Sequence, residues 1–228
     1  MAYILENFLA TTFLSSSHFP SLVVIEYWHH GRPTSKVLLT GANGFVASHI
    51  LSSLVKRNYH VVTTVRSEKK VQEILDLTPS WKPNITFIYV PNIIVPNAFN
   101  GAFADRGYDN ISHNASPLNF QAKEIQSEII DPAVAGTKGL IEYAHKHGGD
   151  NLKQSVLLGS AIAALNEFED MNKAGNPYTE VTAEYIIENS NIVASYHAFK
   201  ELAGQAAWQN RKKINHNSTS QSSIPTSL

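Results

Sequence analysis

A tyrosine and a lysine one helical turn apart are the residues in this sequence best suited to chemistry. Tyr196 and Lys200 stand at positions i and i+4 in a helical pattern that ends near Trp208, so they share one face of a helix. A nearby ammonium favours the phenolate form of tyrosine, which suits the pair to proton transfer. Alone, the same spacing also occurs on ordinary solvated helix faces, so its meaning depends on the elements around it.

A glycine turn between a strand and a helix, within residues 36–50, predicts a dinucleotide-binding site. Residues 37–39 form a short apolar run typical of a buried parallel strand, and residues 45–55 carry apolar side chains at helical spacing. Gly41 permits the tight turn, and Gly44 lets backbone N–H groups approach a pyrophosphate at the positive end of the helix. A chance pair of glycines is the alternative, but strand, turn and helix occur here in the order that the motif requires.

The residues after the second expected strand, 60–65, bear on the choice between NAD and NADP. An acid at this place holds the ribose 2′-hydroxyl of NAD, whereas an arginine accommodates the 2′-phosphate of NADP. Arg66 stands there, followed by Ser67 and, further on, by Lys69 and Lys70. This favours NADP(H), and the alternative is an ordinary solvated helix start.

Strands and helices alternate along the chain, which predicts an α/β fold with a doubly wound, right-handed parallel sheet. The fourth strand is the weakest, because Asn110 and Ser112 occupy positions where apolar residues are expected. The expected strands after the second are 85–90, 107–113 and 155–158, and the expected helices between them are 71–77 and 124–146.

The chain divides into three parts by composition. Residues 1–34 are an apolar and serine-rich extension of unknown role. Residues 35–209 form the expected nucleotide-binding domain. Residues 210–228 are polar with almost no apolar periodicity, so a disordered tail is expected.

Composition excludes several classes of function. The apolar fraction is 43%, charged residues make up 16%, and the formal net charge is −1, so no nucleic-acid partner is expected. The chain has no cysteine, and the His29–His30 pair has no further ligand at metal-binding spacing, so no metal site is expected. No run of 18 apolar residues occurs, so no membrane partner and a cytoplasmic location are expected.

Together these pieces resemble the extended short-chain dehydrogenase/reductases of the NAD-dependent epimerase/dehydratase superfamily. The likeness covers about residues 36–209 and is strongest to the dihydroflavonol 4-reductase-like branch, which includes fungal aldehyde, ketone and methylglyoxal reductases. The motifs that carry it are Thr40-Gly-Ala-Asn-Gly-Phe45, Val65-Arg-Ser67, Val90-Pro91, His113-Asn-Ala-Ser-Pro117, Asp131-Pro-Ala-Val-Ala-Gly-Thr137, Tyr178-Thr-Glu180, Tyr196-His-Ala-Phe-Lys200 and Ala206-Ala-Trp208.

The resemblance implies an NAD(P)-binding Rossmann fold and NADPH-dependent reduction of a small aldehyde or ketone. Tyr196 would protonate the carbonyl oxygen, and Lys200 would assist it and bind the nicotinamide ribose. Ser160 is the candidate for the serine that polarises the carbonyl. A homodimer formed by two helices of the nucleotide fold is known in the family and stays open here. The cofactor-binding residues implied are Gly41, Asn43, Gly44, Phe45, Val46, Arg66, Asn92, Ala115, Ser116, Tyr196 and Lys200.

The sequence departs from the family pattern at several places. The serine that donates to the carbonyl aligns with Ala161, and Ser160, one residue away, is expected to point to the opposite face of an extended segment. Asn92 replaces an aspartate near the adenine, and Phe199 replaces the serine before the lysine. Only 28 residues follow Lys200, so the lobe that builds the substrate pocket is expected to be missing.

These departures leave more than one function open. The chain could be a carbonyl reductase, as the resemblance implies. It could instead be a catalytically impaired remnant or sensor that holds NADP(H), or a truncated product that barely folds. Turnover of small aldehydes separates the first from the second, and cooperative unfolding separates the second from the third.

Overall fold

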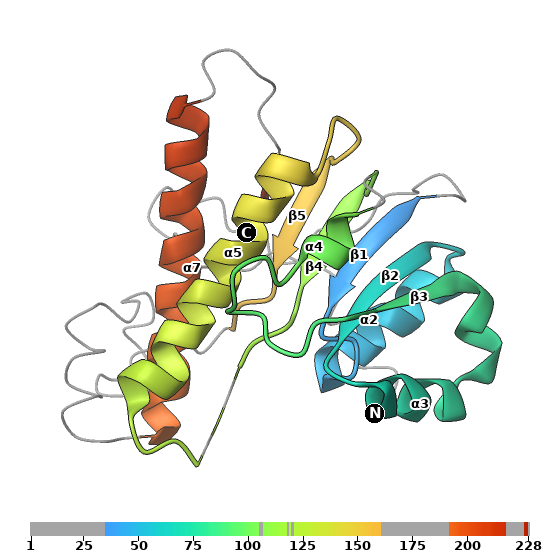
Figure 1. Ribbon diagram of the computed structural model, residues 1–228, viewed down its shortest axis with the longest axis horizontal. Helices are drawn as coiled ribbons and strands as arrows, with labels where there is room; N and C mark the ends of the chain where they lie inside the picture. The colour runs from blue at the N-terminus through green and yellow to red at the C-terminus, as the bar shows by residue number, and fades with distance from the viewer. Residues whose placement is uncertain are drawn as a thin grey trace, which may run out of the picture.

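A parallel sheet with helices on both faces forms the body of the molecule (Figure 1). The computed structural model describes residues 35–104, 107–117, 119, 121–160, 192–217 and 226–227. The strand order is β3-β2-β1-β4-β5-β6, and every pair is parallel. This confirms the expected doubly wound α/β fold. The strands are β1 (Lys36–Thr40), β2 (His60–Val65), β3 (Ile85–Tyr89), β4 (Asn110–His113), β5 (Gln154–Leu157) and β6 (Thr226–Ser227).

The central strand is buried on both faces because helices cover both sides of the sheet. In β1, Val37 and Leu39 belong to an apolar cluster with α2 (Phe45–Lys56), whereas Leu38 belongs to a cluster with α5 (Asp131–His147). Successive side chains of a strand point to opposite faces, so the continuous apolar run is the pattern that a parallel strand between two helical layers requires.

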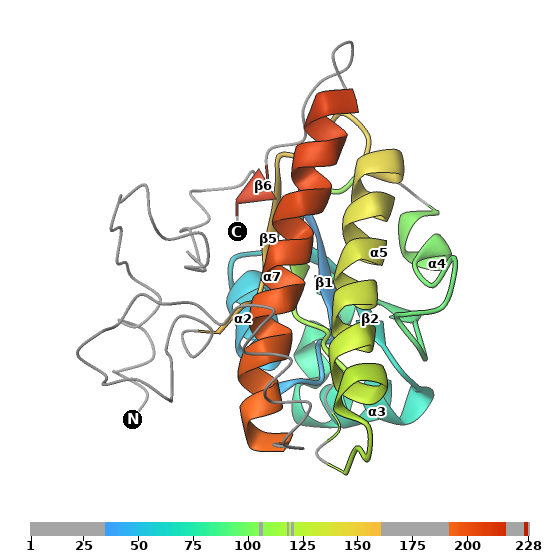
Figure 2. The ribbon, with the colours of Figure 1, turned by 90° about the vertical axis from the view of Figure 1, so that its left-hand side faces the viewer.

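The remaining helices complete the two layers. In α3 (Glu68–Leu77), Ile74 packs with α2 against one face, and α4 (Asn100–Phe103) packs with α5 against the other. Figure 2 shows α5 and α7 (Ile192–Asn217) side by side, and a third apolar cluster joins them. A 3₁₀ helix, η1 (Pro79–Asn84), fills the interval between the expected helix 71–77 and the expected strand 85–90 and leads into β3.

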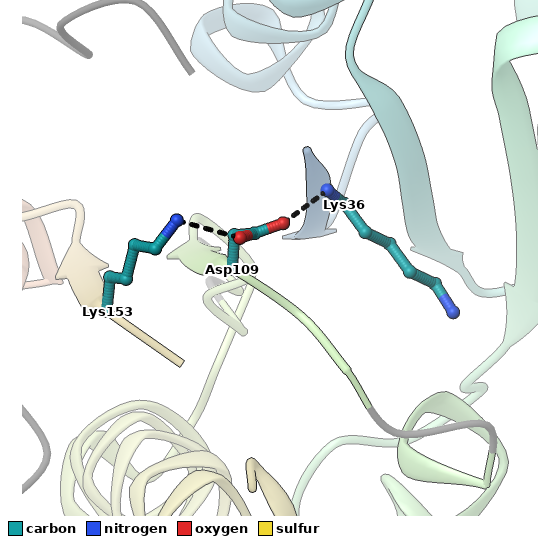
Figure 3. Close-up of polar contacts among 3 residues, drawn as sticks. All are labelled: Lys36, Asp109 and Lys153. Atoms are coloured by element: carbon teal, nitrogen blue, oxygen red, sulfur yellow. Dashed lines mark hydrogen bonds and ion pairs between the residues drawn. The ribbon is translucent and has the colours of Figure 1, made fainter. Parts of the chain in front are cut away.

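The fourth strand is shorter than the expected 107–113, because Asp109 bonds to residues at the starts of two neighbouring strands instead of continuing β4. Gly107 has a φ of +84°, and β4 begins only at Asn110. The Asp109 carboxylate accepts hydrogen bonds from the backbone N–H of Lys36, at 2.9 Å, and from the Nζ of Lys153, at 3.0 Å (Figure 3). Its backbone also bonds to the same two residues. Asp109 therefore joins the amino-terminal ends of three strands.

The expected helix 124–146 begins with an irregular turn. Residues Gln126–Ile130 form a π-helix, η2, which continues into α5. Pro132 is in the first turn of α5 and has no N–H to donate to an earlier carbonyl. The N–H of Asp131 bonds instead to the carbonyl of Gln126, which gives the wider i→i+5 turn.

The last helix extends past residue 209, the boundary expected for the nucleotide-binding domain. It continues to Asn217, so residues 210–217, which the sequence predicts to be part of a disordered tail, are helical. The expected extension at 1–34, Ala161, the Tyr178-Thr-Glu180 motif and residues 218–225 lie outside the described residues. Among the helices that the structure describes, none is long and apolar enough to cross a bilayer.

Candidate functional site: the carboxyl-terminal edge of the sheet

The glycine turn is fixed to the strands on both sides of β1. The N–H of Gly41 lies 3.2 Å from both the carbonyl and the side-chain oxygen of Thr64 in β2. Gly41 has a φ of +71°, and a Cβ atom added to it would lie 3.0 Å from the Cα of Ala115, which follows β4. A residue with a side chain would be strained here and would also push Ala115 away. The turn that follows β1 therefore contacts the carboxyl-terminal ends of β2 and β4.

The first turn of α2 presents backbone N–H groups to the outside. Gly44 is its N-cap, and no side chain caps this helix, so its first N–H groups lack partners within the helix. Asn43, Gly44, Phe45 and Val46 are all exposed, and 78% of Phe45 is accessible. Such a helix start favours an anion.

In the charged run after β2, Arg66 is exposed, whereas Glu68 and Lys70 each bond to another side chain. Arg66 is exposed at the end of β2, and the described residues give it no ion pair. Lys70 pairs with Glu73 at 2.7 Å. The hydroxyl of Tyr89 donates to Glu68 at 2.8 Å, which raises the pKa of the tyrosine because the bonded carboxylate stabilises the protonated phenol.

Asn92 lies on the same edge and is exposed. Its side-chain oxygen accepts a hydrogen bond from the N–H of Ile94 at 3.0 Å, as in the Asx turns that shape loops. The predicted contact of Asn92 with a cofactor stays a prediction, and the side-chain amide N–H₂ would have to make it.

The loop after β4 is tied to β1 through one hydroxyl group. The Oγ1 of Thr40 accepts hydrogen bonds from the backbone N–H groups of Asn114 and Ala115, each at 3.0 Å. It also lies 2.8 Å from the Nδ1 of His113. Ala115 and Ser116, both predicted to bind the cofactor, are half-buried beside it.

His113 is buried at the end of β4, with 4% of its surface exposed. Burial lowers its pKa to about 3, and the positive charge of Lys200 acts in the same direction. The imidazole is therefore neutral at physiological pH. The Nζ of Lys200 bonds to the carbonyl of Leu158, whose N–H bonds to the carbonyl of His113 at 2.9 Å, so α7 brings its lysine close to the carboxyl end of β4.

Lys200 contacts the end of the neighbouring strand. Its Nζ donates to the backbone carbonyl of Leu158, just after β5, at 3.1 Å. Burial lowers the pKa of Lys200 to about 8, because a low-dielectric surrounding disfavours the charged form. Tyr196, half-buried one turn earlier on α7, makes an edge contact with the ring of Phe199, with the ring centroids 5.1 Å apart.

Phe199 departs from the family pattern, and Ser160 is the residue before a second departure, Ala161. Phe199 is 1% exposed and belongs to the apolar cluster between η2, α5 and α7, so the phenyl ring that replaces the serine serves packing. Ser160 is half-buried and follows Leu158 closely. Its role as a carbonyl donor stays a prediction.

Sequence reasoning did not assign Thr40 and His113 to the site. Both belong to quoted motifs, but their side-chain contact depends on the register of β1 and β4, in which they are paired. The available signal was a polar residue at the carboxyl end of each of two buried strands. That pattern places both residues at the carboxyl-terminal edge of the sheet but does not predict a hydrogen bond between their side chains.

The residues of this edge fit a dinucleotide. A Cβ atom would fill the space at Gly41, the start of α2 is uncapped and exposed, and Arg66 stands exposed where a 2′-phosphate would lie. The predicted residues from β1, β2, β4 and α7 thus lie along one edge of the sheet, where open α/β folds bind ligands.

Comparison with known proteins agrees with this arrangement. The family model described as the NAD dependent epimerase/dehydratase family matches residues 37–203. An uncharacterized oxidoreductase of Saccharomyces cerevisiae is 34% identical over 185 residues, which cover 79% of this chain and 53% of that protein. Dihydroflavonol 4-reductase of Solanum lycopersicum is 30% identical over 190 residues, which cover 82% of this chain and 48% of that protein.

A solved structure shows the same fold with a cofactor. The crystal structure of yeast methylglyoxal/isovaleraldehyde reductase complexed with NADPH superposes with a TM-score of 0.71 and 26% identity, and the match covers 84% of this chain and 55% of the reductase. The chain spans about half the length of the relatives it matches. On the match to residues 37–203, this chain belongs to the NAD dependent epimerase/dehydratase family.

Proposed function

We propose that this chain binds NADP(H) at the carboxyl-terminal edge of its sheet and uses Tyr196 and Lys200 to reduce a small aldehyde or ketone. The observation that carries the proposal is the position of Lys200. Its Nζ reaches the end of β5 at Leu158, on the edge where Gly41 and Ala115 meet. The helix with the Tyr-x-x-x-Lys pair therefore reaches the edge that the glycine turn occupies.

The pyrophosphate would bind to the open N–H groups at the start of α2. Gly44 and Phe45 would approach it with their backbone, and Arg66 would hold the 2′-phosphate by charge-assisted hydrogen bonds. The preference for NADPH rests on Arg66 and on the NADPH in the crystal structure of the yeast reductase.

The chemistry that a bound nicotinamide supplies is hydride transfer to the carbonyl carbon. Tyr196 would donate its phenolic proton to the carbonyl oxygen. Lys200 would lie beside the phenol as an ammonium at neutral pH, because a pKa of about 8 keeps most of it protonated. The resulting positive charge would favour the phenolate that remains after proton transfer.

Cofactor selectivity is tested by titrating NADPH and NADH into the wild-type chain and the Arg66→Ala variant. Loss of a charge-assisted hydrogen bond should weaken NADPH binding by roughly 10-fold or more and leave NADH binding within about twofold. Arg57→Ala is the matched control, because Arg57 is an exposed arginine that follows the far end of α2. Equal losses of NADPH affinity in both variants would contradict the assignment of Arg66.

Turnover is tested with Tyr196→Phe on a panel of small aldehydes that includes methylglyoxal. Loss of the proton donor should lower turnover by at least about 100-fold while NADPH affinity changes little. Tyr143→Phe is the control, since the Tyr143 hydroxyl lies 2.7 Å from the Oδ1 atoms of Asn97 and Asn100, and Asn100 begins α4, which lies on the other side of α5 from α7 (Figure 2). A wild-type chain that binds NADPH but reduces no aldehyde would favour the second candidate.

The second candidate is an NADP(H)-binding remnant or sensor without catalysis. One observation favours it: Ala161 stands where the family pattern has the serine that donates to the carbonyl. The first measurement is therefore NADPH binding, which both candidates require, followed by turnover, which only the reductase requires.

A further inference from the structure

Three hydrogen-bonding groups meet at the side chain of Thr40. The backbone N–H groups of Asn114 and Ala115 both point to its Oγ1 at 3.0 Å, and the Nδ1 of His113 lies 2.8 Å from the same atom. Both side chains are buried, with exposures of 0% for Thr40 and 4% for His113. These bonds are thus made out of contact with water, where an unmade bond is costly.

The number of hydrogen-bond donors around the Thr40 Oγ1 determines which ring nitrogen of His113 carries the proton. A hydroxyl oxygen has two acceptor positions and one proton to donate. The two backbone N–H groups fill the acceptor positions of Thr40, so its proton must go to the Nδ1 of His113. The ring nitrogen that accepts cannot carry a proton, which places the proton of the neutral ring on Nε2.

The opposite tautomer would leave the network unsatisfied. With a proton on Nδ1, three donors would point to the two acceptor positions of Thr40, and the hydroxyl proton would have no acceptor among these groups. The charged ring also carries a proton on Nδ1 and would therefore leave the same donors without acceptors. Burial independently disfavours the charged ring by lowering the pKa of His113 to about 3. Only the neutral ring with its proton on Nε2 satisfies all four groups at Thr40, and its Nε2–H then has no partner among the described residues.

The hydroxyl of Thr40 in turn holds the loop that bounds the glycine turn. Ala115, one of its two donors, is the residue that a Cβ atom on Gly41 would meet at 3.0 Å. Rotation of the Thr40 side chain about its Cα–Cβ bond would move Oγ1 away from the N–H groups of Asn114 and Ala115 and change the space beside Gly41. The acceptor that prevents this rotation is the Nδ1 of His113.

We propose that His113 is a positioning residue of the nucleotide site: its Nδ1 accepts the Thr40 hydroxyl proton and so keeps the Asn114–Ala115 backbone against the glycine turn. The proposal rests on the proposed NADP(H) site. It gives His113 no contact with the cofactor or with the reacting atoms.

The test compares two substitutions that differ in the acceptor they leave. The Oδ1 of an asparagine can replace Nδ1 of histidine as an acceptor, whereas leucine offers none. His113→Leu should weaken NADPH binding about tenfold, as expected for the loss of one buried hydrogen bond, and His113→Asn should stay within about threefold of wild type. Thr40→Val and Thr40→Ser form the matching pair on the other partner, with the same order of effects.

Two further measurements separate positioning from general stability. Nitrogen NMR of the ligand-free chain should show His113 neutral, with its proton on Nε2. The double variant Thr40→Val/His113→Leu should lose little more affinity than either single variant, because both remove the same bond.

A proton found on Nδ1 would overturn the proposal, as would equal NADPH affinities for His113→Leu and His113→Asn. If the wild-type chain binds no NADPH, the proposed function fails and this proposal fails with it. If the wild type binds NADPH and His113→Leu binds it equally well, this proposal alone fails.

Discussion

The two ends of the parallel sheet are built from the same strands but differ in how their polar groups are satisfied. At the amino end, Asp109 receives hydrogen bonds from Lys36 and Lys153 and joins the starts of three strands (Figure 3). At the carboxyl end, Gly41 has a positive φ, the start of α2 has no side-chain cap among the described residues, and burial lowers the pKa of Lys200.

The carboxyl end also retains buried polar atoms without partners. Among the described residues, these include the Nε2 of His113 and the Oδ1 of Asn114. Unpaired buried groups and a shifted lysine pKa cost stability. The amino end therefore stabilises the sheet, whereas the carboxyl end holds the groups of the proposed binding site at a cost in stability.

Replacement of Lys200 by methionine should stabilise the chain at neutral pH. The pKa of Lys200 is about 8 in the folded chain and about 10.5 when unfolded. The unfolded chain therefore binds more protons between these values, and wild-type stability should rise as pH increases from about 8 to about 10.5. The total is at most about 3 kcal/mol.

Chemical denaturation of wild type and Lys200→Met across this pH range measures the effect. The gain from the substitution should be largest below pH 8 and should shrink as the wild-type lysine loses its charge. The same variant should lose turnover, because it lacks the ammonium beside Tyr196. A stability difference that does not change with pH would contradict the assigned pKa.

Gly41→Ala should destabilise the chain by about 2 kcal/mol and weaken NADPH binding severely. A residue with a Cβ atom costs about 1–2 kcal/mol in the left-handed region, and at Gly41 it also meets Ala115. Gly107→Ala is the matched control, since Gly107 has a φ of +84° with no atom within 4 Å of the added Cβ. Thermal unfolding and NADPH titration of both variants separate backbone strain from the contact. Equal loss of binding in the two variants would refute the role of the contact.

Asp109→Ala should destabilise the chain by about 1–2 kcal/mol, because the backbone N–H of Lys36 loses its charged acceptor. NADPH affinity, measured on the folded protein, should change by less than about twofold. A large loss of affinity would show that the two ends of the sheet are not independent.

Lys153→Met should have the smallest effect, between zero and about 1 kcal/mol. The ion pair with Asp109 is on the surface, and 67% of the lysine side chain is exposed. The comparison of denaturation midpoints for Lys153→Met and Asp109→Ala separates the ion pair from the backbone hydrogen bond. If the two variants are equally destabilised, the ion pair carries the whole contribution of Asp109.

The amino-acid sequence by itself determined the order of strands and helices, the glycine turn, the Tyr-x-x-x-Lys helix and the family. Each of these depends on local periodicity or on spacing along the chain. Val37 to Leu39 show a strand buried on both faces, and Gly41 marks the turn, because the backbone there needs a φ that glycine adopts without cost.

The tertiary structure alone decided which side chains meet. The bond from Thr40 to His113 depends on the register of β1 against β4. Asp109, just before β4, bonds to Lys36 and Lys153, which are far from it in the sequence. The π-helical turn before Pro132 is likewise a local geometry that periodicity does not show. Pairing in a parallel sheet joins residues that are far apart in the chain, so burial, hydrogen-bond partners and pKa values appear only after the strands have assembled.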